Sequence, residues 1–179
     1  MRRYKTILID PPWPLRESGR RNRRKGAHGK ARLPYPTMEW NQLLGLPVPL
    51  LAERGCHLWL WTVNQYLLEA VALMRAWGFT YLAPIHWIKP SGMGNYFVHR
   101  TQTLLFGYYQ TCRFTGLRFA PNIIEAAVPK RHSEKPEESY RLIEEISVGP
   151  RVELFARRRR PNWDAWGNEV VSDFEINCS

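Results

Sequence analysis

Residues 5–13 read KTILIDPPW, a short apolar run that gives way to an acid, two prolines and a tryptophan. The β-branched residues favour a buried strand over 5–9, which must end there because each proline fixes φ and lacks the N–H that a sheet ladder needs. Further strands are predicted over 57–62, 81–88, 103–109, 122–128 and 151–156, and helices over 38–44 (with Thr37 as its cap), 64–77 and 133–147. This alternation predicts an α/β fold: a mostly parallel sheet with helices on both faces.

The chain of 179 residues is sized for one domain, and we expect residues 1–179 to form a single one. It contains no run of about 18 apolar residues, which excludes a membrane-spanning helix. The apolar stretch before Asp10 is too short for a secretory signal, so we expect a cytoplasmic protein. The three cysteines and five histidines are scattered without ligand spacing, so no metal site is predicted.

The formal net charge of +10 is unevenly spread along the chain. Residues 16–32 contain eight Lys or Arg and one acid, whereas residues 133–154 contain six acids and three bases. Such asymmetry is typical of a protein with one surface for a polyanion, and arginine, which provides twenty of the basic residues, pairs its planar fork with phosphate. The charge favours nucleic acid over a membrane as partner, although a solvated basic segment without a specific role would produce the same pattern.

Two Gly-rich segments without an apolar period, residues 15–34 and 89–99, predict loops, and we expect 15–34 and 89–110 to face the substrate. The predicted nucleic-acid contacts come from these two segments and the residue after the first: Arg20, Arg21, Arg23, Arg24, Lys25, Tyr35 and Lys89. The second basic run, Arg157–Arg160, is expected to help hold phosphates on either side of the target base.

Ligands of open parallel sheets bind beyond the carboxyl ends of the strands, where Asp10, Thr62, Lys89 and Arg157 are predicted to lie. The turn after the first strand combines a carboxylate at Asp10, the carbonyls of Pro11 and Pro12 without competing N–H groups, and the flat face of Trp13. Two acceptors and a stacking face match the amino edge of an adenine base. The alternative is a tight turn in which Asp10 caps a neighbouring helix.

The DPPW turn and seven other blocks resemble, in the same order, the adenine N(6)-methyltransferases typified by the seventy-kilodalton catalytic subunit of the messenger-RNA adenosine methyltransferase. The blocks are LPYPTM (33–38), HLWLWTVNQYL (57–67), HWIK (86–89), HSEKP (132–136), ELFAR (153–157), PNW (161–163) and GNE (167–169). The resemblance implies a Rossmann-like methyltransferase fold with rearranged motif order, S-adenosylmethionine as methyl donor and S-adenosylhomocysteine as product.

The resemblance also implies roles for individual residues. Asp10, Pro11, Pro12 and Trp13 would hold the target adenine beside the donor methyl group, with Trp13 or Tyr35 stacking on the base and Trp61 expected to pack in the core. Lys135 would lie near the methionine carboxylate of the donor, and Arg157, Asn168 and Glu169 around its ribose.

Two departures from the family pattern stand out. Relatives usually carry an acid upstream of the DPPW strand that contacts the donor's adenine, and the nine residues before Asp10 contain none. Arg158 and Arg159 replace other residues, and their charge would contact substrate phosphate or nothing.

The polymer and the assembly are left open by the sequence. The compact domain favours DNA over RNA as substrate, and related enzymes often work as homodimers or with a second subunit. The competing hypothesis is a catalytically silent relative that binds nucleic acid or supports an active partner.

Overall fold

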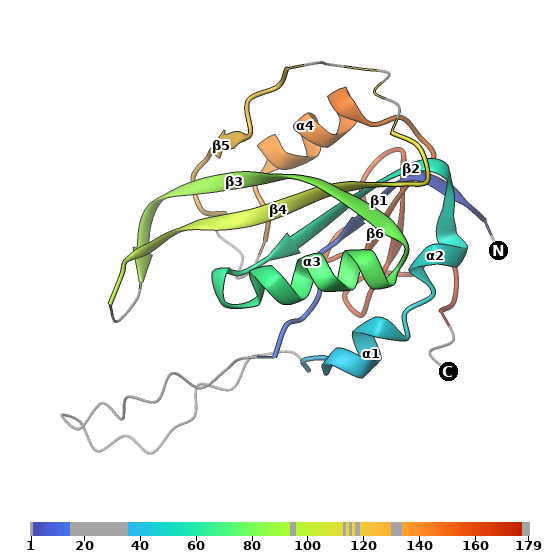
Figure 1. Cartoon of the computed structure of the whole chain (residues 1–179), viewed down its shortest axis with the longest axis horizontal. Coiled ribbons are helices and arrows are strands. Elements are labelled where there is room, and N and C mark those ends of the chain that lie inside the picture. The colour runs from blue at the N-terminus through green and yellow to red at the C-terminus, as the bar shows by residue number, and fades with distance from the viewer. Residues whose placement is uncertain are drawn as a thin grey trace.

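A seven-stranded sheet forms the centre of the molecule (Figure 1). The computed structural model describes residues 2–14, 36–93, 96–112, 114, 116, 119–129 and 134–176. The strands are β1 (Tyr4–Ile9), β2 (Ala52–Thr62), β3 (Phe79–Met93), β4 (His99–Tyr109), β5 (Ile123–Glu125), β6 (Arg151–Leu154) and β7 (Trp163–Trp166), in the order β5-β3-β4-β2-β1-β6-β7. Among these strands β4 alone is antiparallel to its neighbours, so the other strands end at one common edge. The predicted mostly parallel sheet is confirmed.

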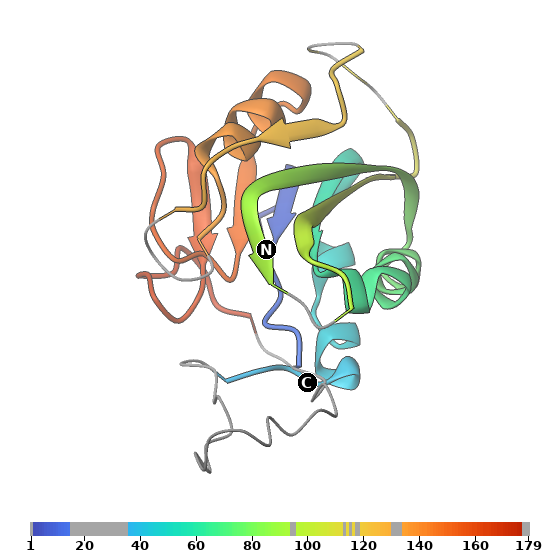
Figure 2. The same cartoon turned by 90° about the vertical axis from the view of Figure 1, so that its left-hand side faces the viewer.

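Helices cover both faces of this sheet (Figures 1 and 2). They are α1 (Trp40–Leu44), α2 (Val48–Leu51), the 3₁₀ turn η1 (Asn64–Tyr66), α3 (Leu67–Ala76) and α4 (Glu137–Ile146). Successive strand residues point to opposite faces, so Ile7 and Ile9 pack with α1, α2 and α3, whereas Leu8 packs with Trp59 and with α4. The two hydrophobic clusters fix the sheet between the two helical layers.

The first helix begins later than predicted. Glu39, not Thr37, occupies its N-cap, because the Glu39 side chain accepts the N–H of Gln42 while the Gln42 side chain accepts the N–H of Glu39 at 2.8 Å. The helix predicted over 133–147 begins at Glu137 with Pro136 as its N-cap. Two elements, α2 and β7, were not predicted at all.

The predicted loop over 89–99 is wrong for most of its length. β3 continues to Met93 and pairs there with His99 of β4, so residues 89–93 and 99–109 belong to two paired strands that extend past the other strands (Figure 1). Gly92 indicates a close backbone approach instead of a loop, because a Cβ there would lie 2.2 Å from the His99 carbonyl oxygen. Pro84 is tolerated within β3 because the pairing with β5 begins only at His86.

Within the described residues, no helix is both long and apolar enough to cross a membrane. The prediction of a single domain over residues 1–179 stays a prediction.

Gly107 of β4 is required by packing and its replacement tests the fold. A Cβ at this position would lie 2.5 Å from Cε of Met74 in α3 and 2.7 Å from the carbonyl oxygen of Thr80 in β3. We expect Gly107→Ala to lower the free energy of unfolding by about 1–3 kcal/mol, because the backbone of β3 at Thr80 must move and the Met74 side chain must take another position. Chemical denaturation measures this change, and an unaltered midpoint would contradict the packing described.

Candidate active site at the carboxyl edge of the sheet

Asp10 and Lys135, 125 positions apart, meet at the carboxyl edge of the sheet. Asp10 directly follows β1, and Lys135 directly precedes the N-cap of α4. The Lys135 ammonium group donates to the Asp10 carboxylate, and their side chains are only 6% and 18% exposed. The same ammonium group lies 5.5 Å from the centre of the Trp61 ring. Two predicted site residues are thus brought together in a largely desolvated ion pair.

The DPPW turn is held rigidly by backbone hydrogen bonds. The Pro11 carbonyl accepts the N–H of Trp13 at 2.8 Å, and the Pro12 carbonyl accepts the N–H of Met38 at 3.0 Å. The expectation that both carbonyls lack competing N–H groups is therefore corrected: each already accepts one bond. A carbonyl oxygen has two lone pairs, so Pro11 keeps one acceptor position beside Asp10.

Trp13 anchors this turn against Trp61 and Tyr66. Its indole N–H donates to the Trp61 carbonyl at 3.1 Å, and its ring stacks on Tyr66 at 5.4 Å with an interplanar angle of 14°. The residue is 8% exposed, so one ring face is already covered in the structure. Trp61 is fully buried, as expected for a packing residue.

A pocket of about 390 Å³ lies beside the turn. Its walls are mainly aromatic and acidic, and they come from the turn, α1, η1 and α3: Trp13, Pro14, Glu39, Trp40, Leu43, Tyr66 and Glu69. The exposed part of Trp13 therefore faces a hollow large enough for a planar ring.

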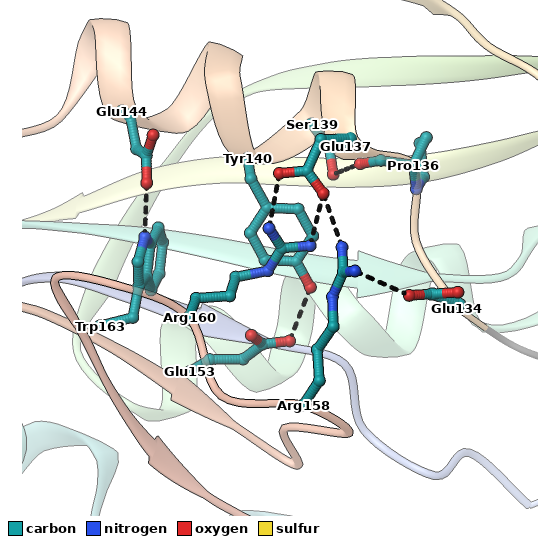
Figure 3. Close-up of polar contacts among 10 residues, drawn as sticks. All are labelled: Glu134, Pro136, Glu137, Ser139, Tyr140, Glu144, Glu153, Arg158, Arg160 and Trp163. Carbon is teal, nitrogen blue, oxygen red and sulfur yellow. Dashed lines mark hydrogen bonds and ion pairs between the residues drawn. The ribbon is translucent and has the colours of Figure 1, made fainter. Parts of the chain in front are cut away.

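Glu153 is a buried carboxyl group behind the ion pair, and sequence reasoning missed it. It lies on β6 and accepts the hydroxyl of Tyr140 at 2.8 Å (Figure 3). Burial raises its pKa to about 7, and the charge of Asp10 acts in the same direction. An acid inside the apolar run RVELFA is the signal that could have identified it.

The arginines of the Arg157–Arg160 run point alternately to two sides of the chain. Arg158 and Arg160 reach Glu137 at the start of α4, both at 2.6 Å (Figure 3). Arg157 pairs with Glu169 at 3.0 Å, and Arg159 pairs with Asp173 at 2.6 Å. Each of the four has a carboxylate partner within the protein. The four guanidinium groups are thus held by Glu137, Glu169 and Asp173, and the expectation that this run contacts substrate phosphate stays a prediction.

The residues predicted around the donor's ribose lie at the same edge as Asp10. Leu154 of β6 pairs with Trp166 of β7, so the turns that carry Arg157 and, after β7, Asn168 and Glu169 are adjacent. Gly167 allows this approach, because a Cβ there would lie 2.5 Å from the Ala156 carbonyl oxygen. An ammonium group for a carboxylate and amide and carboxylate groups for hydroxyls fit the methionine and ribose parts of S-adenosylmethionine.

The predicted nucleic-acid contacts are only partly within the described residues. Lys89 lies on β3 with its ammonium group 4.7 Å from the centre of the Trp87 ring, and burial together with the charge of Lys135 lowers its pKa. Arg20, Arg21, Arg23, Arg24, Lys25 and Tyr35 lie outside the described residues. The hairpin that carries Lys89 presents Tyr96 and Phe97, which are 84% and 78% exposed.

Comparison with known proteins settles the family. The MT-A70 family model matches residues 4–169. The chain belongs to the MT-A70 family. Type II methyltransferase M.MunI of Mycoplasma sp. is 28% identical over 188 residues, an alignment that covers 94% of this chain and 78% of that protein.

Human relatives match the same part of this MT-A70 chain. N(6)-adenine-specific methyltransferase METTL4 of Homo sapiens is 30% identical over 94% of this chain and 38% of that protein. N(6)-adenosine-methyltransferase catalytic subunit METTL3 of Homo sapiens is 26% identical over 94% of this chain and 28% of that protein. The chain spans well under half of these two proteins. The resemblance and the predicted Rossmann-like methyltransferase fold are confirmed, and the family supports the prediction of an adenine N(6)-methyltransferase.

The described residues contain no group of three or more His, Cys, Asp or Glu that could hold a metal ion. The prediction that the MT-A70 chain uses no metal stays a prediction.

Glu153 should make the stability of the fold depend on pH. Its pKa of about 7 lies above 4.5, the ordinary value for a glutamate side chain, so the folded state binds the proton more tightly than the unfolded chain. The stabilisation from this group is complete below pH 4.5 and is lost as the pH rises through 7. Glu153→Gln keeps an acceptor for Tyr140. As the pH rises across this interval, we expect its free energy of unfolding to increase by about 2–3 kcal/mol relative to that of the parent protein.

Urea denaturation between pH 5 and 8 measures this difference. The matched control is Glu145→Gln, a change of an exposed acid on α4. The difference between its free energy of unfolding and that of the parent protein should not change with pH. A constant offset for Glu153→Gln as well would contradict the raised pKa.

Proposed function

We propose that this MT-A70 chain transfers a methyl group from S-adenosylmethionine to the exocyclic amino group of adenine in nucleic acid, with DNA preferred to RNA. The observation that carries the proposal is the desolvated pair of Asp10 and Lys135 beside the DPPW turn, at the edge where the ends of β6 and β7 meet. METTL4 is named as an adenine-specific and METTL3 as an adenosine methyltransferase, which supports the same base for this chain.

The amino group of adenine is a poor nucleophile because its lone pair is delocalised into the ring. Asp10 accepts one of its hydrogens and the second lone pair of the Pro11 carbonyl accepts the other, which favours a pyramidal nitrogen with a directed lone pair. S-adenosylmethionine, when bound, supplies the sulfonium methyl group and leaves as S-adenosylhomocysteine. The methylated nitrogen loses its extra proton to water, so the chain needs no separate base. Positioning and electrostatics therefore provide most of the catalysis.

Lys135 serves two anions in this proposal. An ammonium group has three N–H donors, so Lys135 can stay bonded to Asp10 while it holds the methionine carboxylate. Asn168 and Glu169 offer acceptors and donors to the ribose hydroxyls. Glu169 is also bonded to Arg157, which fixes its carboxylate in the turn after β7.

The target base must leave its stack to reach Asp10, at a cost of a few kcal/mol in a duplex. The pocket beside Trp13 supplies aromatic surface near the turn, and the hairpin with Tyr96 and Phe97 supplies exposed rings. Residues 70–124 contain no Asp or Glu, so the hairpin lies in a part of the sequence without acids that would repel phosphate. The proposal also includes an assembly: the chain works as a homodimer or together with a second subunit.

Replacement of Asp10 tests the chemistry. We expect Asp10→Ala to lower methyl transfer by about 100-fold or more, because the acceptor for the amino group is lost. The assay compares incorporation of labelled methyl into single-stranded DNA, duplex DNA and RNA of matched sequence. If the parent protein methylates none of them, it is a silent relative; if RNA is the better substrate, the preference for DNA is wrong. Calorimetric titration with S-adenosylhomocysteine tells whether a lower rate of Asp10→Ala comes from lost chemistry or from weaker binding of the donor.

Replacement of basic residues tests the nucleic-acid surface. We expect the combined change of Arg20, Arg21, Arg23 and Arg24 to Gln to weaken DNA binding and to reduce the slope of log K against log salt by about 2–4. The control is Arg159→Gln, which should leave the slope unchanged because Arg159 already pairs with Asp173. Equal slopes for the quadruple variant and the parent protein would place the phosphate contacts elsewhere.

A further inference from the structure

The segment that carries Lys135 is fastened to the chain after β6 by ion pairs. Glu134 contacts Arg158 at 3.5 Å, and Glu137 contacts Arg158 at 2.6 Å. Glu137 also receives two hydrogen bonds from the guanidinium group of Arg160, at 2.6 and 2.9 Å (Figure 3). Lys135 lies between these two glutamates in sequence, so both of its flanks are bound to one short stretch after β6.

Arg160 is a rigid partner for Glu137. Its side chain is 10% exposed, and its guanidinium carbon lies 3.3 Å from the centre of the Tyr140 ring. Tyr140 in turn donates to the buried Glu153 of β6. The Tyr140 ring therefore fixes the position of the Arg160 guanidinium group. A guanidinium group in a fixed position also fixes the orientation of the carboxylate that it binds, here that of Glu137.

An ordinary helix-end role does not explain Glu137. Two acids begin α4, Glu137 and Glu138, and both lie where a helix N-terminus favours negative charge. Of these two acids, Glu137 alone makes an ion pair with the chain after β6 in the described part of the structure. The N-cap, Pro136, makes no side-chain cap hydrogen bond, and its carbonyl accepts the Ser139 hydroxyl at 2.6 Å, a contact within the first turn that does not reach the chain after β6 (Figure 3).

We propose that Glu137 is a positioning residue: through Arg158 and Arg160 it fixes the first turn of α4 so that the Lys135 ammonium group stands at Asp10 and in reach of the methyl donor's carboxylate. The inference rests on the proposed role of Lys135 in donor binding. Lysine has a flexible four-carbon stem, so the place of its ammonium group depends on how firmly the backbone below it is held.

The experiment compares Glu137→Gln with Glu138→Gln, which makes the same change of charge on the next residue of the same turn. Calorimetric titration with S-adenosylhomocysteine should show about 5-fold weaker binding for Glu137→Gln and less than 2-fold change for Glu138→Gln. With saturating S-adenosylmethionine, kcat of Glu137→Gln should stay within about 2-fold of the parent protein while KM for the donor rises. A lower melting temperature with unchanged donor binding would overturn the proposal, because it would show a purely structural role.

A double-mutant cycle separates action through Lys135 from a general effect. On a Lys135→Gln background, Glu137→Gln should change the dissociation constant of S-adenosylhomocysteine by less than 2-fold. An equal loss on both backgrounds would mean that Glu137 acts on the donor site by another route and would overturn the proposal.

A measurement without the donor keeps this inference distinct from the proposed function. The chain has six lysines, so the ε-methylene NMR signal of Lys135 can be assigned by its loss in Lys135→Gln. Its chemical shift should move in Glu137→Gln and not in Glu138→Gln. If the parent protein fails to bind S-adenosylhomocysteine, the proposed function fails, yet this signal still decides whether Glu137 positions Lys135; an unmoved signal overturns the inference.

Discussion

A buried ammonium group needs a carboxylate beside it, and this requirement brings together the turn after β1 and the segment before α4. Lys135, which is 6% exposed, meets Asp10 at the point where β1 ends and α4 is about to begin. Removing either partner would leave a charge in a desolvated place, which typically costs about 3–5 kcal/mol. The DPPW turn and the cap of α4 are therefore bound to one another before any ligand is considered, and the ends of β6 and β7 lie along the same edge.

The charged groups beside this ion pair form a series of contacts that runs from the buried Glu153 to Glu137 at the surface. Glu153 lies behind it with Tyr140, Arg160 covers the Tyr140 ring, and Glu137 closes the series at the surface. Since the pKa of Glu153 is about 7, the charge of this layer changes near neutral pH, whereas Arg160 stays charged throughout. The ion pair of Asp10 and Lys135 thus faces solvent on one side and a carboxyl group of variable charge on the other.

The sequence predicted the parts of this site that belong to strand ends. Asp10 and Arg157 could be placed because a buried strand, a break and a polar residue follow one another, and that pattern is local. Asn168 was assigned through the family resemblance, because the strand before it, β7, was not predicted. Lys135 could be assigned only through the family resemblance. The partners of Glu137 could not be predicted, because ion pairs between α4 and the chain after β6 depend on how the helix lies over the sheet. The six acids of residues 133–154 and the four arginines after them were nevertheless visible as opposite charges.

The same residues show why a run of charge in a sequence differs from a charged surface. Arg157–Arg160 was interpreted as a phosphate-binding stretch because the four cations are consecutive. The chain bends at Arg157 and Arg158, and the four side chains diverge: Arg158 and Arg160 reach α4, whereas Arg157 and Arg159 reach the segment after β7. Carboxylates meet them on both sides, so the run connects the start of α4 with the segment after β7. The positive charge of this run is thus offset by Glu137, Glu169 and Asp173, which a count along residues 157–160 does not reveal.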